Sequence, residues 1–127
     1  MTVEYLHTKH APEAIGPYAQ ATKAGGFLFT AGQIALDPAT MQVVEGDITA
    51  QAEQVMKNLN AVLANAGCGW KDVVKTTIFI TTFDDFAKLN EVYGRHLGST
   101  KPARSTVAVA GLPKGVRVEI ECVAKLP

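Results

Sequence analysis

The sequence predicts an α+β fold in which a mixed six-stranded sheet carries two helices on one face. Six short runs are rich in β-branched and aromatic residues, and two longer segments repeat apolar residues at helical spacing. The order along the chain is strand, strand, strand, helix, strand, helix, strand, strand. Because only two amphipathic helices are expected, they cover one face of the sheet and leave the other face open.

Three short strands are expected in the first third of the chain. The first spans residues 3–7 and is followed by a loop at 11–18 that two prolines stiffen. The next two, at 19–23 and 27–31, form a hairpin across a pair of glycines. Gly32 ends this hairpin and permits either a bulge or a ligand close to the backbone.

Two amphipathic helices follow, separated by one strand. The first is expected at about residues 48–66, with Asp47 or Thr49 as its N-cap. A run of β-branched residues at 73–80 predicts the strand, and the second helix is expected at about 83–97. A glycine follows each helix, which is a common helix stop.

The last quarter of the chain contains the candidate site. Strands are expected at 105–109 and 116–124, on either side of a turn at 111–115. Glu119 lies in the middle of the apolar final strand, which is unusual for a carboxyl group, and Arg104 opens the preceding strand. A fixed guanidinium and a sheltered carboxylate are what a site for a small carboxylic acid requires.

The open face of the sheet is expected to carry both of these side chains. Thr106, Ala108 and Val123 are placed on the same face by period-2 alternation. This face is too apolar in places to be covered by water alone. An oligomer that packs its sheet faces together would cover it, so the sequence predicts an oligomer.

The charge balance and the cysteines limit the class of protein. Twelve basic and twelve acidic side chains cancel, so nothing predicts an electrostatic binder of nucleic acid or of a membrane surface. Residues 1–10 are polar and no apolar run approaches a membrane span, so neither a secretory leader nor a membrane helix is expected. Cys68 and Cys122 are interpreted as reduced thiols in a cytoplasmic protein.

No metal or cofactor site is predicted. His7 and His10 have metal-ligand spacing, but no third ligand is evident and His96 is remote in the sequence. The chain has neither a phosphate-binding loop nor a Ser-His-Asp order.

Six segments, taken together, resemble one family. They are IGPY (15–18), TAGQI (30–34), DVVKTTIFI (72–80), NEVY (90–93), PARSTV (102–107) and LPKGVRVEIE (112–121). In this order and with near-constant spacing they resemble the RidA family, the YjgF-type reactive-intermediate deaminases. The resemblance implies one domain over residues 1–127, a chorismate-mutase-like α+β fold, and a homotrimer with three pockets between subunits. It also implies hydrolysis of 2-enamine and 2-imine acids, such as 2-aminoacrylate, to 2-keto acids and ammonia.

The resemblance also assigns roles to individual residues. It gives Arg104 the substrate carboxylate and gives Glu119 the attacking water, while Tyr18 lines the pocket. The backbone of Gly32 helps to hold the ligand, and Asn90 lies near the site.

Two substrate-binding positions depart from the family pattern. Ala31 stands where many members have serine, and Thr106 stands where many have cysteine. Threonine can still donate a hydrogen bond, whereas alanine loses a hydroxyl group. We expect these departures to affect substrate range and turnover more than the fold.

The chemistry is reasonable without the family name. A 2-imino acid is already electrophilic at C2, so neither a metal nor a covalent nucleophile is needed. Arg104 can grip the carboxylate through two charge-assisted hydrogen bonds, each worth roughly 1.5–3 kcal/mol when sheltered. An apolar site would raise the pKa of Glu119 and let it shuttle a proton, which typically accelerates a reaction by ~10²–10⁴-fold.

Two arrangements of the last two strands remain open. In a simple hairpin Glu119 would face about Ala108, and Arg104 would lie roughly 13 Å farther along. The topology of the family instead places the final strand in mid-sheet, so that the turn is a crossover.

Other functions are also open. The same pocket could serve a sensor for a small keto or amino acid, or the trimer could act as a chaperone-like partner. A specialised deaminase, acting for instance on 2-aminomuconate, would have the same skeleton. RNA cleavage is attributed to some relatives, but the neutral charge balance argues against it here. In the absence of a site, Arg104 and Glu119 would be interface or salt-bridge residues.

Overall fold

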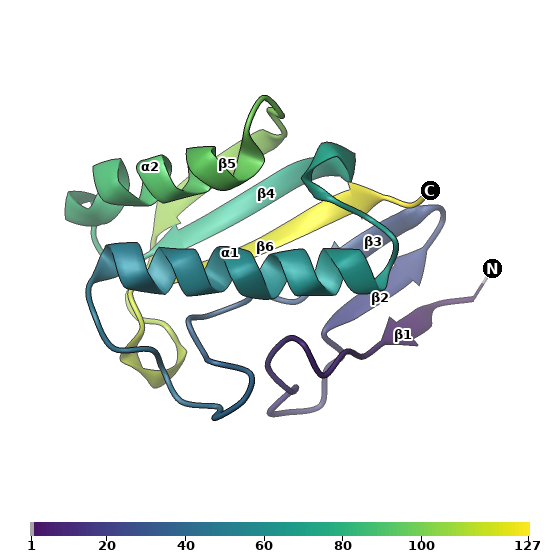
Figure 1. Ribbon diagram of the computed structural model, residues 1–127, viewed down its shortest axis with the longest axis horizontal. Coiled ribbons are helices and arrows are strands. Elements are labelled where there is room, and N and C mark those ends of the chain that lie inside the picture. The colour runs from purple at the N-terminus through teal and green to yellow at the C-terminus, as the bar shows by residue number, and fades with distance from the viewer. Residues whose placement is uncertain (1) are drawn as a thin grey trace.

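The computed structural model describes residues 2–127 and has the expected α+β architecture, with two helices packed on one face of a six-stranded sheet (Figure 1). The predicted order of elements is confirmed. The domain predicted over residues 1–127 includes Met1, which lies outside the described residues. In chain order the elements are β1 (Glu4–Leu6), β2 (Ala21–Ala24), β3 (Phe27–Thr30), α1 (Ile48–Asn65), β4 (Val73–Ile80), α2 (Phe86–Leu97), β5 (Ala103–Ala108) and β6 (Val118–Lys125).

The sheet is mixed, with strand order β1-β2-β3-β6-β4-β5. The β4 and β5 strands run parallel, and every other neighbouring pair is antiparallel. The last strand, β6, is therefore in mid-sheet, and β4 separates it from β5. The connection that contains the 3₁₀ turn Pro113–Gly115 is a crossover and not a hairpin, which settles the question left open by the sequence.

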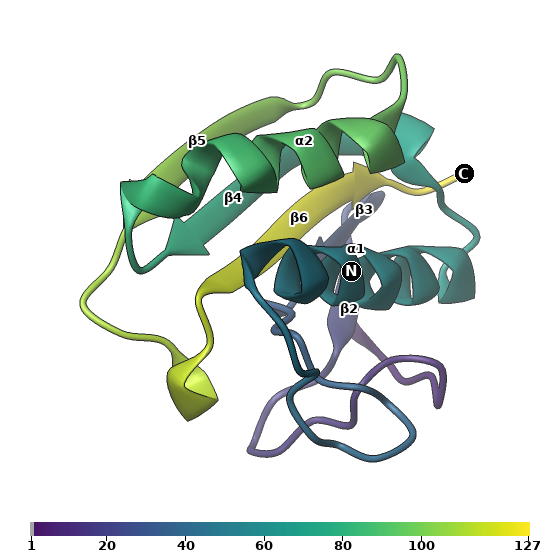
Figure 2. The same cartoon turned by 60° about the vertical axis from the view of Figure 1, so that its left-hand side comes forward.

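The core lies between the sheet and the two helices. Both helices lie on the same side of the sheet, with α2 near β5 and α1 near β6 (Figure 2). Leu59 and Leu63 of α1 and Leu89 of α2 are fully buried against Ile78 and Ile120 of the sheet. Alternate side chains of β6, from Val118 to Ala124, are buried in this layer.

The helix ends follow local chemistry. The Asp47 carboxylate accepts hydrogen bonds from the backbone N–H groups of Thr49 and Ala50, so Asp47 is the N-cap of α1. Gly67, just beyond the C-cap, has φ +76°, a conformation that favours glycine. The second helix begins at Phe86, because the three residues before it form a separate 3₁₀ turn.

The register corrects one prediction about the open face. Arg104, Thr106 and Ala108 pair with Thr76, Ile78 and Ile80 of β4, whose side chains are buried beneath the helices. These three residues of β5 therefore face the helix layer, whereas Glu119 and Val123 face the opposite side. The prediction that all five share the open face is wrong, because alternation within a strand does not fix its register against a neighbour.

The face opposite the helices is partly apolar and uncovered in the single chain. Phe29 is 44% exposed and Val107 is 42% exposed. Assembly into an oligomer through this face stays a prediction. Neither helix of residues 2–127 is long and apolar enough to cross a lipid bilayer.

Candidate functional site

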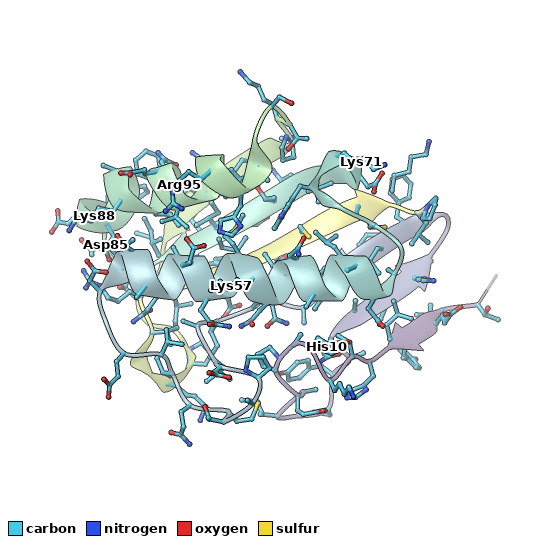
Figure 3. The ribbon with its side chains drawn as sticks, viewed as in Figure 1. His10, Lys57, Lys71, Asp85, Lys88 and Arg95 are labelled. Atoms are coloured by element: carbon cyan, nitrogen blue, oxygen red, sulfur yellow. The ribbon has the colours of Figure 1, made fainter. Side chains whose placement is uncertain are left out.

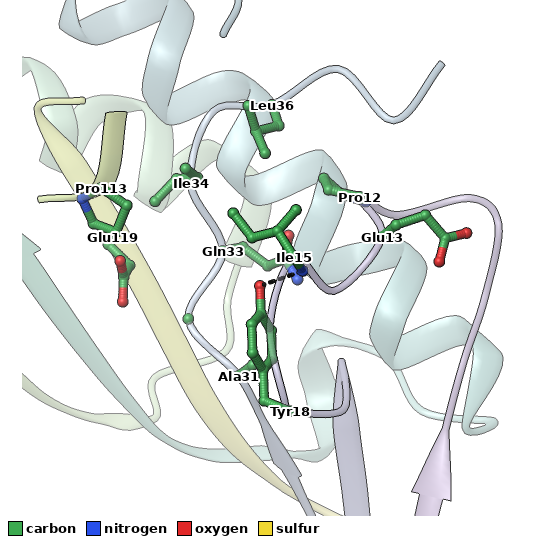
Figure 4. Close-up of a pocket in the computed structure, with 11 residues that line it drawn as sticks. Pro12, Glu13, Ile15, Tyr18, Ala31, Gln33, Ile34, Leu36, Pro113 and Glu119 are labelled. Atoms are coloured by element: carbon green, nitrogen blue, oxygen red, sulfur yellow. Dashed lines mark hydrogen bonds between the residues drawn. The ribbon is translucent and has the colours of Figure 1, made fainter. Parts of the chain in front are cut away.

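A hollow of about 400 Å³ lies between the loop after β1, the segment after β3, and β6 (Figure 4). Four of the predicted site residues line it, namely Tyr18, Ala31, Gly32 and Glu119. Apolar side chains, among them Ile15, form most of the remaining wall. We call this cavity the Glu119 hollow.

Glu119 is the acidic group at the wall formed by β6. Burial raises the pKa of its carboxyl group, and the nearby carboxylate of Glu121 raises it further. Within residues 2–127, no hydrogen-bond donor or basic side chain is paired with this carboxylate. Its oxygens are thus free to bond with a molecule in the hollow.

Gly32 makes room for this carboxyl group. A Cβ atom at position 32 would overlap the side chain of Glu119, only 2.7 Å from its carboxyl carbon. The neighbouring residue Gln33 exchanges two backbone hydrogen bonds with Ile120, of 2.9 and 3.1 Å, which hold the two segments in register. The glycine therefore permits the close approach of a side chain, which is a use that the sequence did not reveal.

Tyr18 places its phenol at the mouth of the hollow. Its hydroxyl oxygen accepts a 3.2 Å hydrogen bond from the backbone N–H of Ile15 (Figure 4). A tight turn, in which the Tyr18 N–H donates to the Gly16 carbonyl, precedes the side chain. Since the oxygen accepts that bond, the hydroxyl proton remains free for an acceptor in the hollow.

Arg104 belongs to a second group of residues, on the helix side of β5. Its Nη1 donates a 2.8 Å hydrogen bond to Oδ1 of Asn90 on α2. Its guanidinium carbon lies 5.1 Å from the ring centre of Tyr93 and 5.7 Å from that of Phe86. We call these four residues the Arg104 cluster.

Thr106 lies two residues beyond Arg104 on the same side of β5. Its hydroxyl oxygen is buried and has no hydrogen-bond partner among the described residues. An unpaired buried hydroxyl is unfavourable, so a ligand that supplied a partner would be stabilised there.

The two groups do not meet within one chain. Arg104 pairs with Thr76 of β4, and Glu119 pairs with Phe79 on the other side of that strand. Three residues along and two strand spacings across separate their Cα atoms by about 14 Å. Their side chains also leave opposite faces of the sheet, so one small molecule cannot touch both in a single chain.

The comparisons with known proteins assign the family. A family model described as Endoribonuclease L-PSP, which covers the YjgF and RidA proteins, matches residues 8–126. The chain belongs to the RidA family. It is 57% identical over 129 residues to the RutC family protein slr0709 of Synechocystis, covering 100% of this chain and 99% of that protein. It is 44% identical over 119 residues to human 2-iminobutanoate/2-iminopropanoate deaminase, covering 94% and 87%.

Solved RidA-family structures have the same fold. RidA from the Antarctic bacterium Psychrobacter superposes with a TM-score of 0.93 at 45% identity, covering 97% of this chain and 99% of that one. Escherichia coli TdcF with bound serine gives a TM-score of 0.91 at 41% identity, covering 98% and 99%.

Two buried amides that support the Glu119 hollow were missed by the sequence analysis. Gln20 donates to the carbonyls of Thr8 and Pro12, at 3.0 and 2.8 Å, and so ties the loop after β1 to β2. Asn58 of α1 donates to the carbonyls of the wall residues Ile34 and Leu36. A polar residue inside the apolar stripe of α1 was a signal that could have identified Asn58.

Two histidines of this RidA-family chain lie beside carboxylates. His7 lies 2.8 Å from the Glu13 carboxylate, and His96 lies 2.7 Å from that of Glu53. Figure 3 shows His10 on the loop that follows β1. In the described part of the chain, no three His, Cys, Asp or Glu side chains gather as metal ligands would.

Proposed function

We propose that this protein hydrolyses reactive 2-enamine and 2-imine acids, such as 2-aminoacrylate, to 2-keto acids and ammonia. The family and the relatives named as deaminases support this reaction class. The observation that carries the proposal is Arg104, a guanidinium fixed by Asn90 and two rings but left without an acidic partner in residues 2–127.

Arg104 is suited to bind the substrate carboxylate. A guanidinium has five N–H donors, and one of them is used by Asn90. Enough donors remain for the two parallel hydrogen bonds that a carboxylate accepts. Serine, the ligand of E. coli TdcF, is a small acid of this kind. The unpaired hydroxyl of Thr106 provides one further contact for the ligand.

Glu119 is suited to move the proton. In its ionised form it accepts a proton from water as the oxygen bonds to C2, and the imine nitrogen then takes up that proton. Glu119 then takes the hydroxyl proton of the tetrahedral adduct and passes it to the amine nitrogen, so that the C2–N bond breaks, ammonia leaves and the keto oxygen stays on C2. An enamine reaches the same imine by protonation at C3. The raised pKa of Glu119 brings this carboxyl group closer to the pH at which a general base works best.

We place the complete pocket between two copies of the chain. Arg104 and Glu119 cannot share a small ligand in one copy, because they lie on opposite faces of the sheet. The partly apolar open face offers a surface for assembly. A homotrimer, with a mass of about 3 × 13.5 = 40.5 kDa, would then hold three pockets. We also propose a cytoplasmic location, on the basis of two cysteines that are buried and unpaired.

The decisive experiment mixes two inactive variants. Arg104→Ala and Glu119→Gln are each expected to lose most turnover of an imino acid that is generated in a coupled assay. After unfolding and refolding together in equal amounts, about one quarter of the pockets would combine an intact Arg104 from one copy with an intact Glu119 from the next. We expect turnover to return toward that fraction.

The controls separate the alternatives. Each variant refolded alone should stay inactive. If the mixed sample recovers no activity, then Arg104 and Glu119 act within the same copy, or they lie outside the site. Ligand binding without turnover by the parent protein would favour a sensor, and cleavage of RNA that persists in Arg104→Ala would point to a different activity. Comparison of 2-aminoacrylate with 2-aminomuconate tests a specialised deaminase.

A further inference from the structure

We infer that Tyr93, anchored by Thr76, is a positioning residue that holds Arg104 in the orientation needed for a carboxylate. This inference rests on the proposed function, since it concerns the arginine that we place against the substrate. It adds two side chains, one from α2 and one from β4, that the resemblance and the comparisons leave without a role.

Tyr93 and Thr76 form a buried polar pair inside an apolar layer. Their hydroxyl oxygens are 2.7 Å apart, Tyr93 is only 6% exposed, and Thr76 is fully buried. A buried phenol needs a hydrogen-bond partner, and threonine supplies it in the middle of a strand that is otherwise apolar on this face. The bond fixes the tilt of the ring.

The Tyr93 ring in turn lies against the guanidinium of Arg104. Phe86, Asn90 and Tyr93 recur at helical spacing, so α2 presents them as one stripe toward β5. Arg104 lies along this stripe, with the two rings and the amide oxygen as its contacts. An arginine side chain is otherwise flexible, and contacts on several sides select one orientation.

Thr76 closes the set of contacts. It is the direct cross-strand neighbour of Arg104 in the parallel β4–β5 pair. Thr76 is thus linked to Arg104 in two ways. It is the neighbour of Arg104 across the sheet, and it bonds to Tyr93, whose ring lies against the guanidinium. Burial raises the pKa of the Tyr93 phenol, in spite of the opposing effects of Thr76 and Arg104, so the phenol is neutral at neutral pH and either hydroxyl can donate the bond.

Four variants test the anchor. Tyr93→Phe and Thr76→Val each remove one hydroxyl of the pair and keep the shape of the side chain. We expect each to raise KM for the imino acid about 3- to 10-fold, with kcat within about two-fold, because carboxylate binding is weakened. The double variant should be no worse than either single one. Thr76→Ser keeps the hydroxyl group, so its KM should equal that of the parent protein.

A matched control separates positioning from stability. Val62→Ala removes two buried methyl groups from a residue of α1 that is not part of either site. It should lower Tm and leave KM unchanged. If Tyr93→Phe and Thr76→Val change KM no more than Val62→Ala does at a similar loss of Tm, the inference is wrong.

The same experiment distinguishes this failure from that of the proposed function. If Arg104→Ala has the KM and kcat of the parent, Arg104 does not bind the substrate carboxylate, and both its proposed role and the inference fail. If Arg104→Ala abolishes turnover while Tyr93→Phe keeps the parent KM, only the inference fails. Calorimetric binding of 2-oxobutanoate, a stable small keto acid, provides a second measurement. There the two anchor variants should weaken binding by the same 3- to 10-fold, and a parent that neither turns over nor binds would overturn both.

Discussion

The carboxyl group of Glu119 occupies the space in which a side chain at position 32 would begin. A Cβ atom on Gly32 would lie 2.7 Å from the carboxyl carbon and 2.9 Å from Cγ of Glu119. The backbone φ of Gly32 lies outside the left-handed region. Glycine is therefore needed here because it leaves space for the carboxyl group of Glu119, and not because of its dihedral angles. The position of the acid thus depends on a residue that has no side chain.

Gly32→Ala is therefore expected to displace Glu119 from the hollow. A misplacement of about 1 Å can lower a rate by roughly 10²-fold, so we expect kcat/KM to fall about 10- to 100-fold. The fold should persist, because the carboxyl group can move toward solvent. Steady-state kinetics and a thermal melt together measure both effects.

Gly69→Ala is the control for this substitution. Its added Cβ would meet no atom within 4 Å, and its backbone is extended. We expect parent activity. Equal kinetics for the two alanine variants would mean that the place of Glu119 does not matter for turnover.

Glu119→Gln is predicted to change the dependence of stability on pH. Burial, together with Glu121, raises the pKa of this carboxyl group above its ordinary value of 4.5, so the folded state binds the proton more tightly than the unfolded chain. The stabilisation is fully present below pH 4.5 and is lost as the pH rises through the folded pKa. The glutamine variant should have the higher Tm at neutral pH, with a gap that closes on acidification.

The measurement is a series of thermal melts from pH 4 to pH 8. Glu91→Gln, which removes an exposed carboxylate from α2, controls for the general change in net charge. A parent protein that is more stable than Glu119→Gln at neutral pH would contradict the assigned environment of the acid.

Helix α1 shows what the sequence was able to predict. The apolar stripe, the Asp47 cap and the glycine stop predicted a helix at about 48–66, and the helix runs over Ile48–Asn65. These signals are local, since each depends on residues within a few turns of one another. The number and order of the strands were predicted for the same reason.

The relation between Arg104 and Glu119 shows what the sequence could not predict. Their placement depends on the insertion of β4 between β5 and β6, and on a register that local alternation does not contain. The resemblance supplied Tyr18 and Gly32 as site residues, but not the contact of Gly32 with the acid. The Tyr93–Thr76 pair joins two elements and is visible only in the folded chain.

Asn58→Ala is predicted to loosen one wall of the Glu119 hollow. Asn58 is 1% exposed, and its amide donates to the carbonyls of Ile34 and Leu36 at 3.1 and 2.9 Å. Both carbonyls would lose a partner in a buried position, which typically destabilises a protein by about 1–3 kcal/mol. Urea unfolding measures the loss, and we expect KM to rise because the wall contacts the ligand space.

Asn60→Ala is the matched control, since Asn60 is an exposed residue of the same helix. Its effect on the free energy of unfolding should stay within about 0.5 kcal/mol. If both variants unfold at the same urea concentration, Asn58 does not support the hollow.

The open face of the sheet provides the last prediction. Phe29 and Val107 project from this face and are 44% and 42% exposed. In the double variant Phe29→Glu/Val107→Glu, the two new carboxylates would oppose packing against another copy. We expect light scattering to give 13.5 kDa for this variant instead of about 40.5 kDa. Its circular dichroism should be unchanged, because both side chains point away from the core, but turnover should be lost with the shared pocket.

Lys57→Glu, on the exposed side of α1, should keep the mass and turnover of the parent. A parent that is itself monomeric and active would refute the shared pocket.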